Sequence, residues 1–149
     1  MTGGDNLHFW QTTALEGLSP DQWEALCDGC GRCCLQKLRE HLTGRVYYTR
    51  VACRLLDTQR CRCQDYTRRT TRVSNCMTLT PKAVRRTEWL PSTCAYRRLA
   101  MGLDLPDWHP LISNRADSVH RAGISVRHLA VPFDDVPPEQ YHRYIIELD

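Results

Sequence analysis

The chain has 149 residues, about the length of one domain, of which 42% are hydrophobic and 25% are charged. This balance is that of a globular protein and excludes wholesale disorder, collagen and coiled coil. No apolar run reaches 18 residues, so the sequence predicts no membrane-spanning helix. A secretory signal is not recognisable in the first 30 residues, so we expect a cytoplasmic protein. We predict a single domain over 1–149, with a loose N-terminus over about 1–8 and an acidic C-terminal tail over about 132–149.

The formal net charge of +3 hides an uneven distribution of charge. Between Arg45 and Arg98 there are 13 basic and three acidic residues, a local balance of +10, whereas the rest of the chain has a balance of −7. A basic segment is a candidate surface for nucleic acid or another polyanion. Arginines also compensate the negative charge of an ion held by four thiolates. We favour compensation and keep the polyanion as the alternative.

The first predicted element is a helix whose start is marked by Ser19. The Ser-Pro-Asp-Gln run provides a capping serine, a proline at the first helical position and a glutamine three residues after the cap. This helix is expected to run into a cysteine-rich loop that begins at Cys27. The spacing of Leu35 and Leu38 predicts that helix resumes after the loop.

Strands and helices alternate in the rest of the chain. The β-branched and aromatic residues of 46–51 predict a strand, and the segment from Cys53 to Cys76 is expected to be irregular. Helices are predicted from Thr80 to about Thr87, and from Ser92 or Thr93 to Gly102. A further strand is predicted over 124–131, and a short terminal helix over 141–148. The elements together predict a small α+β fold of short helices with a small antiparallel sheet, stapled by cysteine-bound metal.

Nine cysteines are the most informative feature of the sequence, and all lie between Cys27 and Cys94. An odd count without an export signal is not typical of a disulfide framework. Clustered thiolates in a reducing compartment are more often metal ligands. Nine thiols fit two four-thiolate sites with one spare, and they also fit one site with several further cysteines.

The strongest motif is Cys27-x-x-Cys30-x-x-Cys33-Cys34. Two residues between thiols let both sulfurs turn toward one ion, and three thiols in this spacing can supply three corners of a [4Fe–4S] cluster. Neighbouring residues seldom direct both side chains at one ion, so Cys34 is expected to serve a second ion or to be free. Ligands are ranked in three groups: Cys27, Cys30, Cys33, Cys63 and Cys76 first, then Cys34, Cys53 and Cys94, and Cys61 last.

The run CDGCGRCC resembles the YkgJ-type cysteine-cluster family, small bacterial proteins described as zinc- or iron-chelating domains. That family continues with a cysteine, a tyrosine and an arginine at spacings that Cys63, Tyr66 and Arg69 match, followed by a later cysteine, here Cys76. This chain departs from the pattern at Thr70, where many members have proline, and in the longer distance from Arg69 to Cys76.

A narrower subgroup of uncharacterised proteins is similar to the segments VACRLLD, EWLPSTCAYRRLAMGLDLPDWHPL and SVRHLAV, so that the likeness spans about 9–131. The resemblance implies metal binding without an established activity.

Three residues outside the cysteines are candidates for supporting roles. Tyr66 could donate a hydrogen bond to a thiolate, and Arg69 could orient a thiolate or bind an anion. An ordinary core tyrosine and a solvated arginine are the simpler interpretations. His109 is expected to cap or pack, with a ligand or acid–base role as the less favoured alternative.

The sequence as a whole predicts a cytoplasmic metal-binding protein. Its metal is zinc or iron, including a [4Fe–4S] cluster, in one or two sites; both metals accept thiolate, so ligand type does not separate them. One alternative is an iron–sulfur enzyme of redox or radical type that could modify a protein. The other is a binding module that uses 45–98 against nucleic acid or another polyanion. No membrane partner is expected, and a partner protein is unknown.

Overall fold

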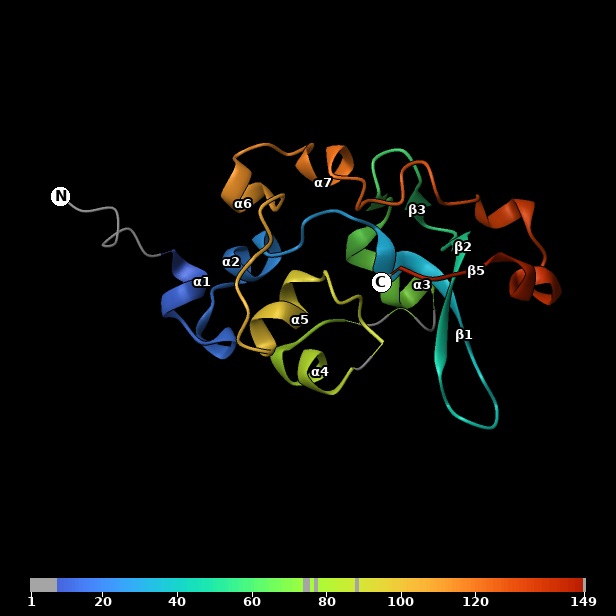
Figure 1. Cartoon of the computed structure of the whole chain (residues 1–149), viewed down its shortest axis with the longest axis horizontal. Helices are drawn as coiled ribbons and strands as arrows, with labels where there is room; N and C mark the ends of the chain where they lie inside the picture. The colour runs from blue at the N-terminus through green and yellow to red at the C-terminus, as the bar shows by residue number, and fades with distance from the viewer. Residues whose placement is uncertain (1–7, 74–75, 77, 88, 149) are drawn as a thin grey trace.

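The computed structural model describes residues 8–73, 76, 78–87 and 89–148, so most of the predicted loose N-terminus lies outside the described residues. Short helices occupy one end of the molecule and a small antiparallel sheet the other (Figure 1). This arrangement confirms the predicted fold class of short helices with a small antiparallel sheet.

Five short helices surround the larger hydrophobic core. Its buried residues include Trp10, Leu26 and Tyr96, with Trp23 and Trp89 packed against them. No helix is longer than two turns among those described, so burial of apolar side chains, rather than intrinsic helix stability, must hold them. The helices of this end are α1 (Phe9–Thr12), α2 (Pro20–Ala25), α4 (Pro81–Arg86), α5 (Ala95–Ala100) and α6 (Pro110–Ser113), with a 3-10 turn at Leu15–Gly17.

Local capping signals place three of these helices. Ser19 caps α2 in a reciprocal box with Gln22, and Thr80 caps α4 through the backbone amide of Ala83, as predicted. Helix α5 begins later than expected, with Cys94 at its N-cap, and it ends before Gly102, whose φ of +79° continues the turn.

The segment after the cysteine-rich loop is a strand, not the predicted helix. A 3-10 turn, Arg32–Cys34, leads into β1 (Leu35–Arg39), which pairs antiparallel with β2 (Val46–Ala52). Leu35 and Leu38 have helical spacing, but the hydrogen bonds offered by β2 favour extended backbone here. Strand β2 confirms the prediction for 46–51, and the sheet order is β1-β2-β5.

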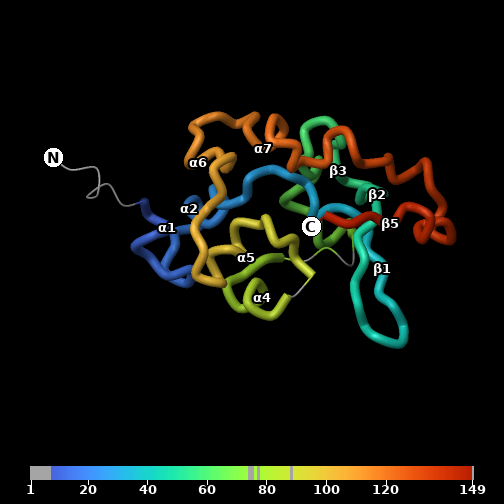
Figure 2. The backbone as a smooth tube through the Cα atoms, in the orientation of Figure 1, coloured from blue at the N-terminus to red at the C-terminus, as the bar shows by residue number. Residues whose placement is uncertain are grey.

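The segment from 53 to 76, expected to be irregular, contains short regular elements. Strands β3 (Leu56–Asp57) and β4 (Arg62–Cys63) form a two-stranded sheet, followed by a 3-10 turn, Tyr66–Arg68, and by α3 (Arg69–Arg72). The tube drawing follows this path as it folds back beside β2 (Figure 2). The fold thus brings the cysteines of this segment to the base of the larger sheet.

The predicted strand over 124–131 is wrong. After α7 (Ser118–Arg121) the chain forms turns, and only Val131 joins the sheet, through a single parallel bridge to Val51. Val126 is fully buried because it packs against the cysteine-rich loop, and its amide donates to the Cys30 carbonyl at 2.9 Å. The alternating apolar residues of 124–131 therefore belong to a loop that packs against the core and not to a strand that pairs in the sheet.

The acidic C-terminal segment packs against the sheet. It forms 3-10 turns at Phe133–Asp135 and Pro138–Tyr144 and ends in β5 (Ile145–Ile146), which pairs with β2. The predicted terminal helix over 141–148 is therefore wrong beyond Tyr144. Val136 and Tyr141 form a small core with Val51 of β2. Burial of these apolar side chains explains why the acidic segment packs against the sheet.

None of the helices in the described part of the chain is long and apolar enough to cross a membrane.

Replacement of Ser19 by alanine is expected to lower the free energy of unfolding by about 1 kcal/mol, because the Gln22 amide loses its acceptor. Ser19→Gly is the matched control and is expected to cost only a few tenths of that, since glycine tolerates the N-cap. Urea denaturation followed by circular dichroism measures both. Equal losses in the two variants would contradict the cap.

Candidate metal centre

The cysteine-rich loop follows α2 and is shaped by a buried aspartate. Asp28 accepts a hydrogen bond from the Cys30 amide at 3.0 Å and another from the Trp108 indole at 3.4 Å. The Arg32 amide donates to the Cys30 sulfur at 3.4 Å. An amide directed at sulfur is the arrangement that stabilises a ligating thiolate.

Gly31 sits where the loop passes closest to the rest of the protein. Its φ is +76°, and a Cβ at this position would lie 2.9 Å from a Val126 methyl carbon and 3.1 Å from the Cys61 Cβ. A side chain is therefore excluded both by backbone conformation and by space. The glycine between Cys30 and Arg32 lets the loop lie flat against the core.

A buried arginine anchors the same loop. Arg32 is 7% exposed, and its Nε donates to the Ile124 carbonyl at 2.8 Å. One of its terminal nitrogens donates to the Thr93 hydroxyl at 3.3 Å and to the Leu148 carbonyl at 3.4 Å. One side chain thus links the loop to three segments that are remote in sequence.

Strand pairing brings Cys53 to the end of the cysteine-rich loop. The ladder pairs Leu35 with Ala52, and one step further the Cys53 amide donates to the Cys34 carbonyl at 2.7 Å. The β3–β4 pair then places Cys63 opposite Leu56, just after Cys53 in the chain. Cysteines separated by up to 29 positions therefore meet at the base of the sheet.

Cys94 approaches the loop from the helical end of the molecule. It is the N-cap residue of α5, and its amide donates to the Pro91 carbonyl at 2.9 Å. Burial raises the pKa of its thiol to about 11, although the amides of Arg97 and Tyr96 lower it. A negative charge on Cys33 also raises the pKa of the Cys94 thiol, so the two cysteines are close enough to interact electrostatically.

Electrostatic coupling groups the loop cysteines with Cys94. Desolvation by the surrounding protein and the charges of Cys33 and Cys94 together raise the pKa of Cys27 to about 12, although the residue is exposed at the surface. Burial and the charges of Asp28, Cys33 and Cys27 also raise the pKa of Cys30. These thiols stay protonated unless a cation compensates them. The first thiol group consists of Cys27, Cys30, Cys33 and Cys94.

The second thiol group begins at the next residue. A hydrogen bond from Cys34 lowers the pKa of Cys33 to about 7, and the same bond, together with burial, raises the pKa of Cys34. The charge of Cys53 adds to the rise at Cys34. Burial raises the pKa of Cys76, and the charges of Cys53, Cys63 and Cys33 contribute. The second thiol group consists of Cys34, Cys53, Cys63 and Cys76.

The thiols of the two groups do not yet converge on a point. Among the described residues no three His, Cys, Asp or Glu side chains are placed to hold one ion as they stand. All nine cysteines are described and all are free. The donor set nevertheless fits zinc or an iron–sulfur cluster, because it is built of thiols with an amide already directed at the Cys30 sulfur.

Lys37 places a positive charge among thiols of both groups. Its Nζ donates to the carbonyls of Cys33 and Leu35 at 2.7 and 2.8 Å, and it lies 4.6 Å from the centre of the Trp89 ring. Burial lowers the pKa of this amine, while negative charge on Cys33, Cys34, Cys53 and Cys76 raises it. A fixed cation here offsets thiolate charge.

Tyr66 and Arg69 contact each other rather than a sulfur atom. The Tyr66 hydroxyl donates to Glu24 at 2.8 Å, and the Arg69 guanidinium lies over the Tyr66 ring at 3.9 Å. Burial, the hydrogen bond to Glu24 and the charge of Cys27 together raise the pKa of Tyr66 to about 12. The two residues thus lie near both thiol groups.

Cys61 has a different environment from the other eight cysteines. It is 4% exposed and packs with Leu35, Leu56 and Val126 in the core beside the sheet. Its sulfur lies 3.8 Å from the Thr58 carbonyl, and its φ is +59°. These contacts are those of a core residue.

His109 is fully buried and has a capping role, as expected. Its Nδ1 accepts from the Leu111 amide at 3.0 Å at the start of α6, which leaves Nε2 to donate to the Leu26 carbonyl at 2.7 Å. Both ring nitrogens are therefore occupied by backbone. Because Leu26 directly precedes Cys27, this contact holds the entry to the cysteine-rich loop.

Sequence reasoning missed three polar residues that support the thiols. Asp28 carried a recognisable signal, since an aspartate two residues before a turn amide commonly accepts from it. Arg32 carried none, because its partners come from segments 61 to 116 residues away, and Lys37 carried none, because the rings of Tyr48 and Trp89 that it faces belong to other elements.

Comparison with known proteins identifies the class of domain. A family model with the CxxCxxCC motif, described as a "Putative zinc- or iron-chelating domain", matches residues 26–95, a range that contains all nine cysteines. The chain belongs to the UPF0260 family. It is 53% identical over 141 residues to a UPF0260 protein of Mesorhizobium japonicum, covering 93% of this chain and 95% of the relative.

A second relative supports the same assignment. A UPF0260 protein of Cellvibrio japonicus is 54% identical over 138 residues, covering 93% of this chain and 94% of the relative. No solved structure matches the chain significantly. The resemblance to a zinc- or iron-chelating cysteine-cluster domain is thus confirmed, whereas the match names no particular metal.

Gly31→Ala is expected to destabilise the protein by about 1–3 kcal/mol more than Gly123→Ala, measured by urea denaturation. The two glycines have φ values of +76° and +75°, so both substitutions carry the same backbone strain. A Cβ at Gly123 meets nothing within 4 Å, whereas one at Gly31 meets Val126 and Cys61. Equal destabilisation would show that close packing of the loop is unimportant.

Proposed function

We propose that this chain is a metal-binding protein with two thiolate centres, one held by each thiol group. The first centre uses Cys27, Cys30, Cys33 and Cys94, the second uses Cys34, Cys53, Cys63 and Cys76, and Cys61 is the spare cysteine. The observation that carries the proposal is the hydrogen bond from the Cys53 amide to the Cys34 carbonyl. It joins the end of the motif to Cys53, and the β3–β4 pair places Cys63 close behind in the fold.

Two further features support this proposal. The raised pKa values of Cys27, Cys30 and Cys94 keep these thiols protonated, so a cation would supply the compensating charge and displace their protons. Cys33 and Cys34 are adjacent in a 3-10 turn and their thiols are hydrogen-bonded to each other, so the two proposed centres would lie side by side and each would take one of these sulfurs. The metal, when bound, supplies structural cross-links between the helical end and the sheet.

We further propose that residues 1–149 act as one domain in the cytoplasm. The contacts of Arg32 span the helical end and the sheet, which supports a single unit. Free thiols at all nine cysteines suit a reducing compartment. In the proposed centres, Tyr66 and Arg69 act on the thiols through charge and packing.

An iron–sulfur enzyme is the second candidate, and a pocket beside the second thiol group favours it. The pocket has a volume of about 370 Å³ and is lined by Cys53 together with polar residues that include Arg54, Asp57 and Gln64. A small polar molecule in this pocket would lie next to a ligand of the second centre. Acid-labile sulfide and a visible absorption band would favour this candidate over a zinc protein.

Anaerobic purification followed by elemental analysis tests the metal content. We expect two metal ions per chain for zinc, or iron with acid-labile sulfide for a cluster, and loss of cooperative folding when a chelator removes the metal. A chain that carries no metal, titrates nine thiols while folded and keeps its unfolding free energy in chelator would overturn the proposal.

Single substitutions test the ligand sets. Cys53→Ser is expected to remove about half of the bound metal, because a three-thiolate site binds far more weakly. Cys30→Ser is expected to remove the other half. Cys61→Ala is the matched control and is expected to keep the full metal content, since Cys61 is a core residue. Metal loss in Cys61→Ala equal to that in Cys53→Ser would contradict the assignment.

A further inference from the structure

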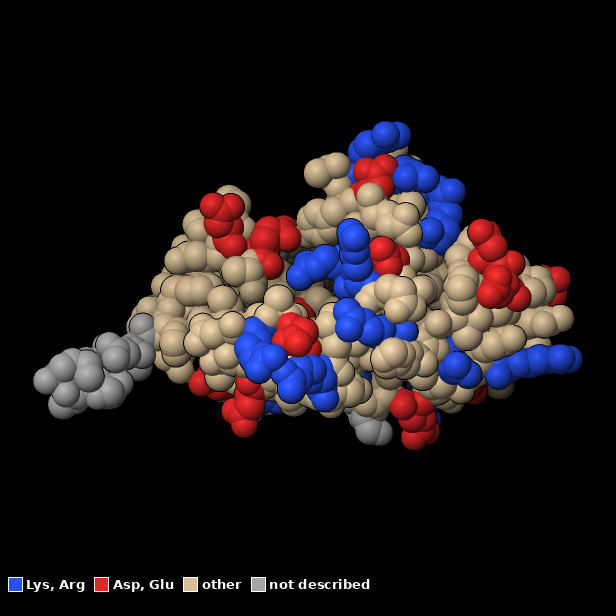
Figure 3. Space-filling view, turned by 90° about the horizontal axis from the view of Figure 1, so that it is seen from above, with Lys and Arg blue, Asp and Glu red and all other residues tan. Residues whose placement is uncertain are grey.

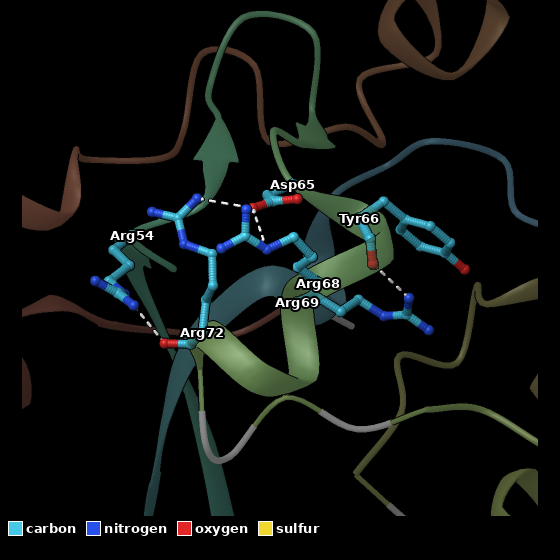
Figure 4. Close-up of polar contacts among 6 residues, drawn as sticks. All are labelled: Arg54, Asp65, Tyr66, Arg68, Arg69 and Arg72. Carbon is cyan, nitrogen blue, oxygen red and sulfur yellow. Dashed lines mark hydrogen bonds and ion pairs between the residues drawn. The ribbon is translucent and has the colours of Figure 1, made fainter.

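Four arginines gather on the surface next to the second thiol group. This arginine cluster consists of Arg54, Arg68, Arg69 and Arg72, of which Arg68 and Arg72 face the carboxylate of Asp65 (Figure 4). A terminal nitrogen of Arg72 lies 3.0 Å from the Asp65 Oδ2, and the Arg68 Nε lies 3.8 Å from the same oxygen. The Arg68 and Arg72 side chains are 72% and 41% exposed, whereas that of Asp65 is 19% exposed. The aspartate thus holds two guanidinium groups at the surface.

The other two arginines are held by neutral groups. Arg54 donates to the Arg72 carbonyl, and Arg69 donates to the Tyr66 carbonyl at 2.7 Å while it lies over the Tyr66 ring. Four guanidinium groups against the carboxylates of Asp65 and Glu24, which accepts from the Tyr66 hydroxyl, leave a local charge of +2. The cluster is therefore positioned but not neutralised by its own contacts.

Compensation of thiolate charge accounts for only part of the arginine cluster. Burial raises the pKa of Cys76, and the charge of Arg69 lowers it, so Arg69 acts toward the thiols. Arg68 and Arg72 instead direct their guanidinium groups to Asp65 at the surface (Figure 4). Their exposed positive charge is available to an external anion.

We propose that the arginine cluster binds the phosphate backbone of a single-stranded nucleic acid. Segment 54–72 contains six arginines and no lysine, and the planar guanidinium group matches phosphate oxygens through paired hydrogen bonds. Tyr66 is 47% exposed and lies beside the cluster; Arg69 covers one face of its ring, so a base would stack on the other face. An acidic peptide would satisfy the charge but would make no use of an aromatic ring.

The surface around the arginine cluster extends the positive charge. Arg60 lies in the β3–β4 turn and Arg62 begins β4, and Arg127 donates to the Gln59 carbonyl in that turn at 2.6 Å. In the space-filling view, basic side chains gather in the upper middle around a few acidic ones, and larger acidic patches lie to either side (Figure 3). Basic groups spaced over a surface in this way are the partners that the phosphates of a single strand contact.

The test uses the full chain, purified with its metal, and a fluorescent oligouridylate of about 12 nucleotides. Fluorescence anisotropy measures the binding affinity at increasing salt concentrations. The double variant Arg68→Gln with Arg72→Gln removes two phosphate contacts. We expect the slope of log K against log salt to fall by about 1.4, which is roughly a 25-fold loss of affinity at 0.1 M salt. The control, Arg86→Gln with Arg143→Gln, removes two exposed arginines elsewhere and is expected to change affinity less than about twofold.

Three results would overturn the proposal. They are no binding by the unmodified chain at roughly 50 mM salt, equal losses in the two double variants, and equal competition by a polyglutamate of the same length. Loss of the Asp65 contacts could unfold the double variant, so circular dichroism accompanies the titration. Arg68→Gln alone, at the most exposed of these side chains, then serves as the test: its expected slope change is about 0.7, and no change would overturn the proposal.

Discussion

The buried guanidinium group of Arg32 links the cysteine-rich loop to the rest of the protein. It donates to oxygens of Thr93, Ile124 and Leu148, all of them neutral. A buried cation without a carboxylate partner is costly unless nearby negative charge offsets it. In the proposed metal-bound state the thiolates of the same loop supply that charge. The anchor of the loop and the electrostatics of its ligands therefore depend on each other.

The hydrophobic core of the described residues is divided and not continuous. The described buried residues form three separate clusters, the smallest of which contains only Val51, Val136 and Tyr141. Cross-links by a structural metal contribute on the order of 10 kcal/mol per site in small zinc domains. The two proposed centres would lie where the helical cluster meets the two clusters of the sheet. Because Cys33 and Cys34 are neighbours, a shift at one centre must move a ligand of the other.

Local signals predicted the elements that depend on local interactions. Ser19 and Thr80 cap their helices, and the β-branched run at 46–51 is a strand, because a few neighbouring residues decide each outcome. The predictions failed where distant partners decide. Leu35 lies in a strand because β2 offers hydrogen bonds, and Val126 is buried in a turn because it packs on Gly31.

The same distinction applies to the candidate site. The cysteine motif and its chemistry were recognisable from spacing, since a chelating turn is local. The division of eight cysteines into two groups that we propose was not recognisable, because it depends on strand register and on the approach of α5. The buried roles of Arg32 and Lys37 were equally hidden, since arginine and lysine are ordinarily surface residues.

The hairpin formed by β1 and β2 projects away from both thiol groups, and its turn is the part of the sheet furthest from them along the strands (Figure 1). Leu42 at this turn is 90% exposed, and the Glu40 and Arg45 backbones already pair across it. Exposed hairpin turns of this kind accept inserted sequence without loss of the surrounding fold. An epitope or a fluorescent reporter could therefore be placed between these strands, which would allow the protein to be followed inside cells while its cysteines remain untouched.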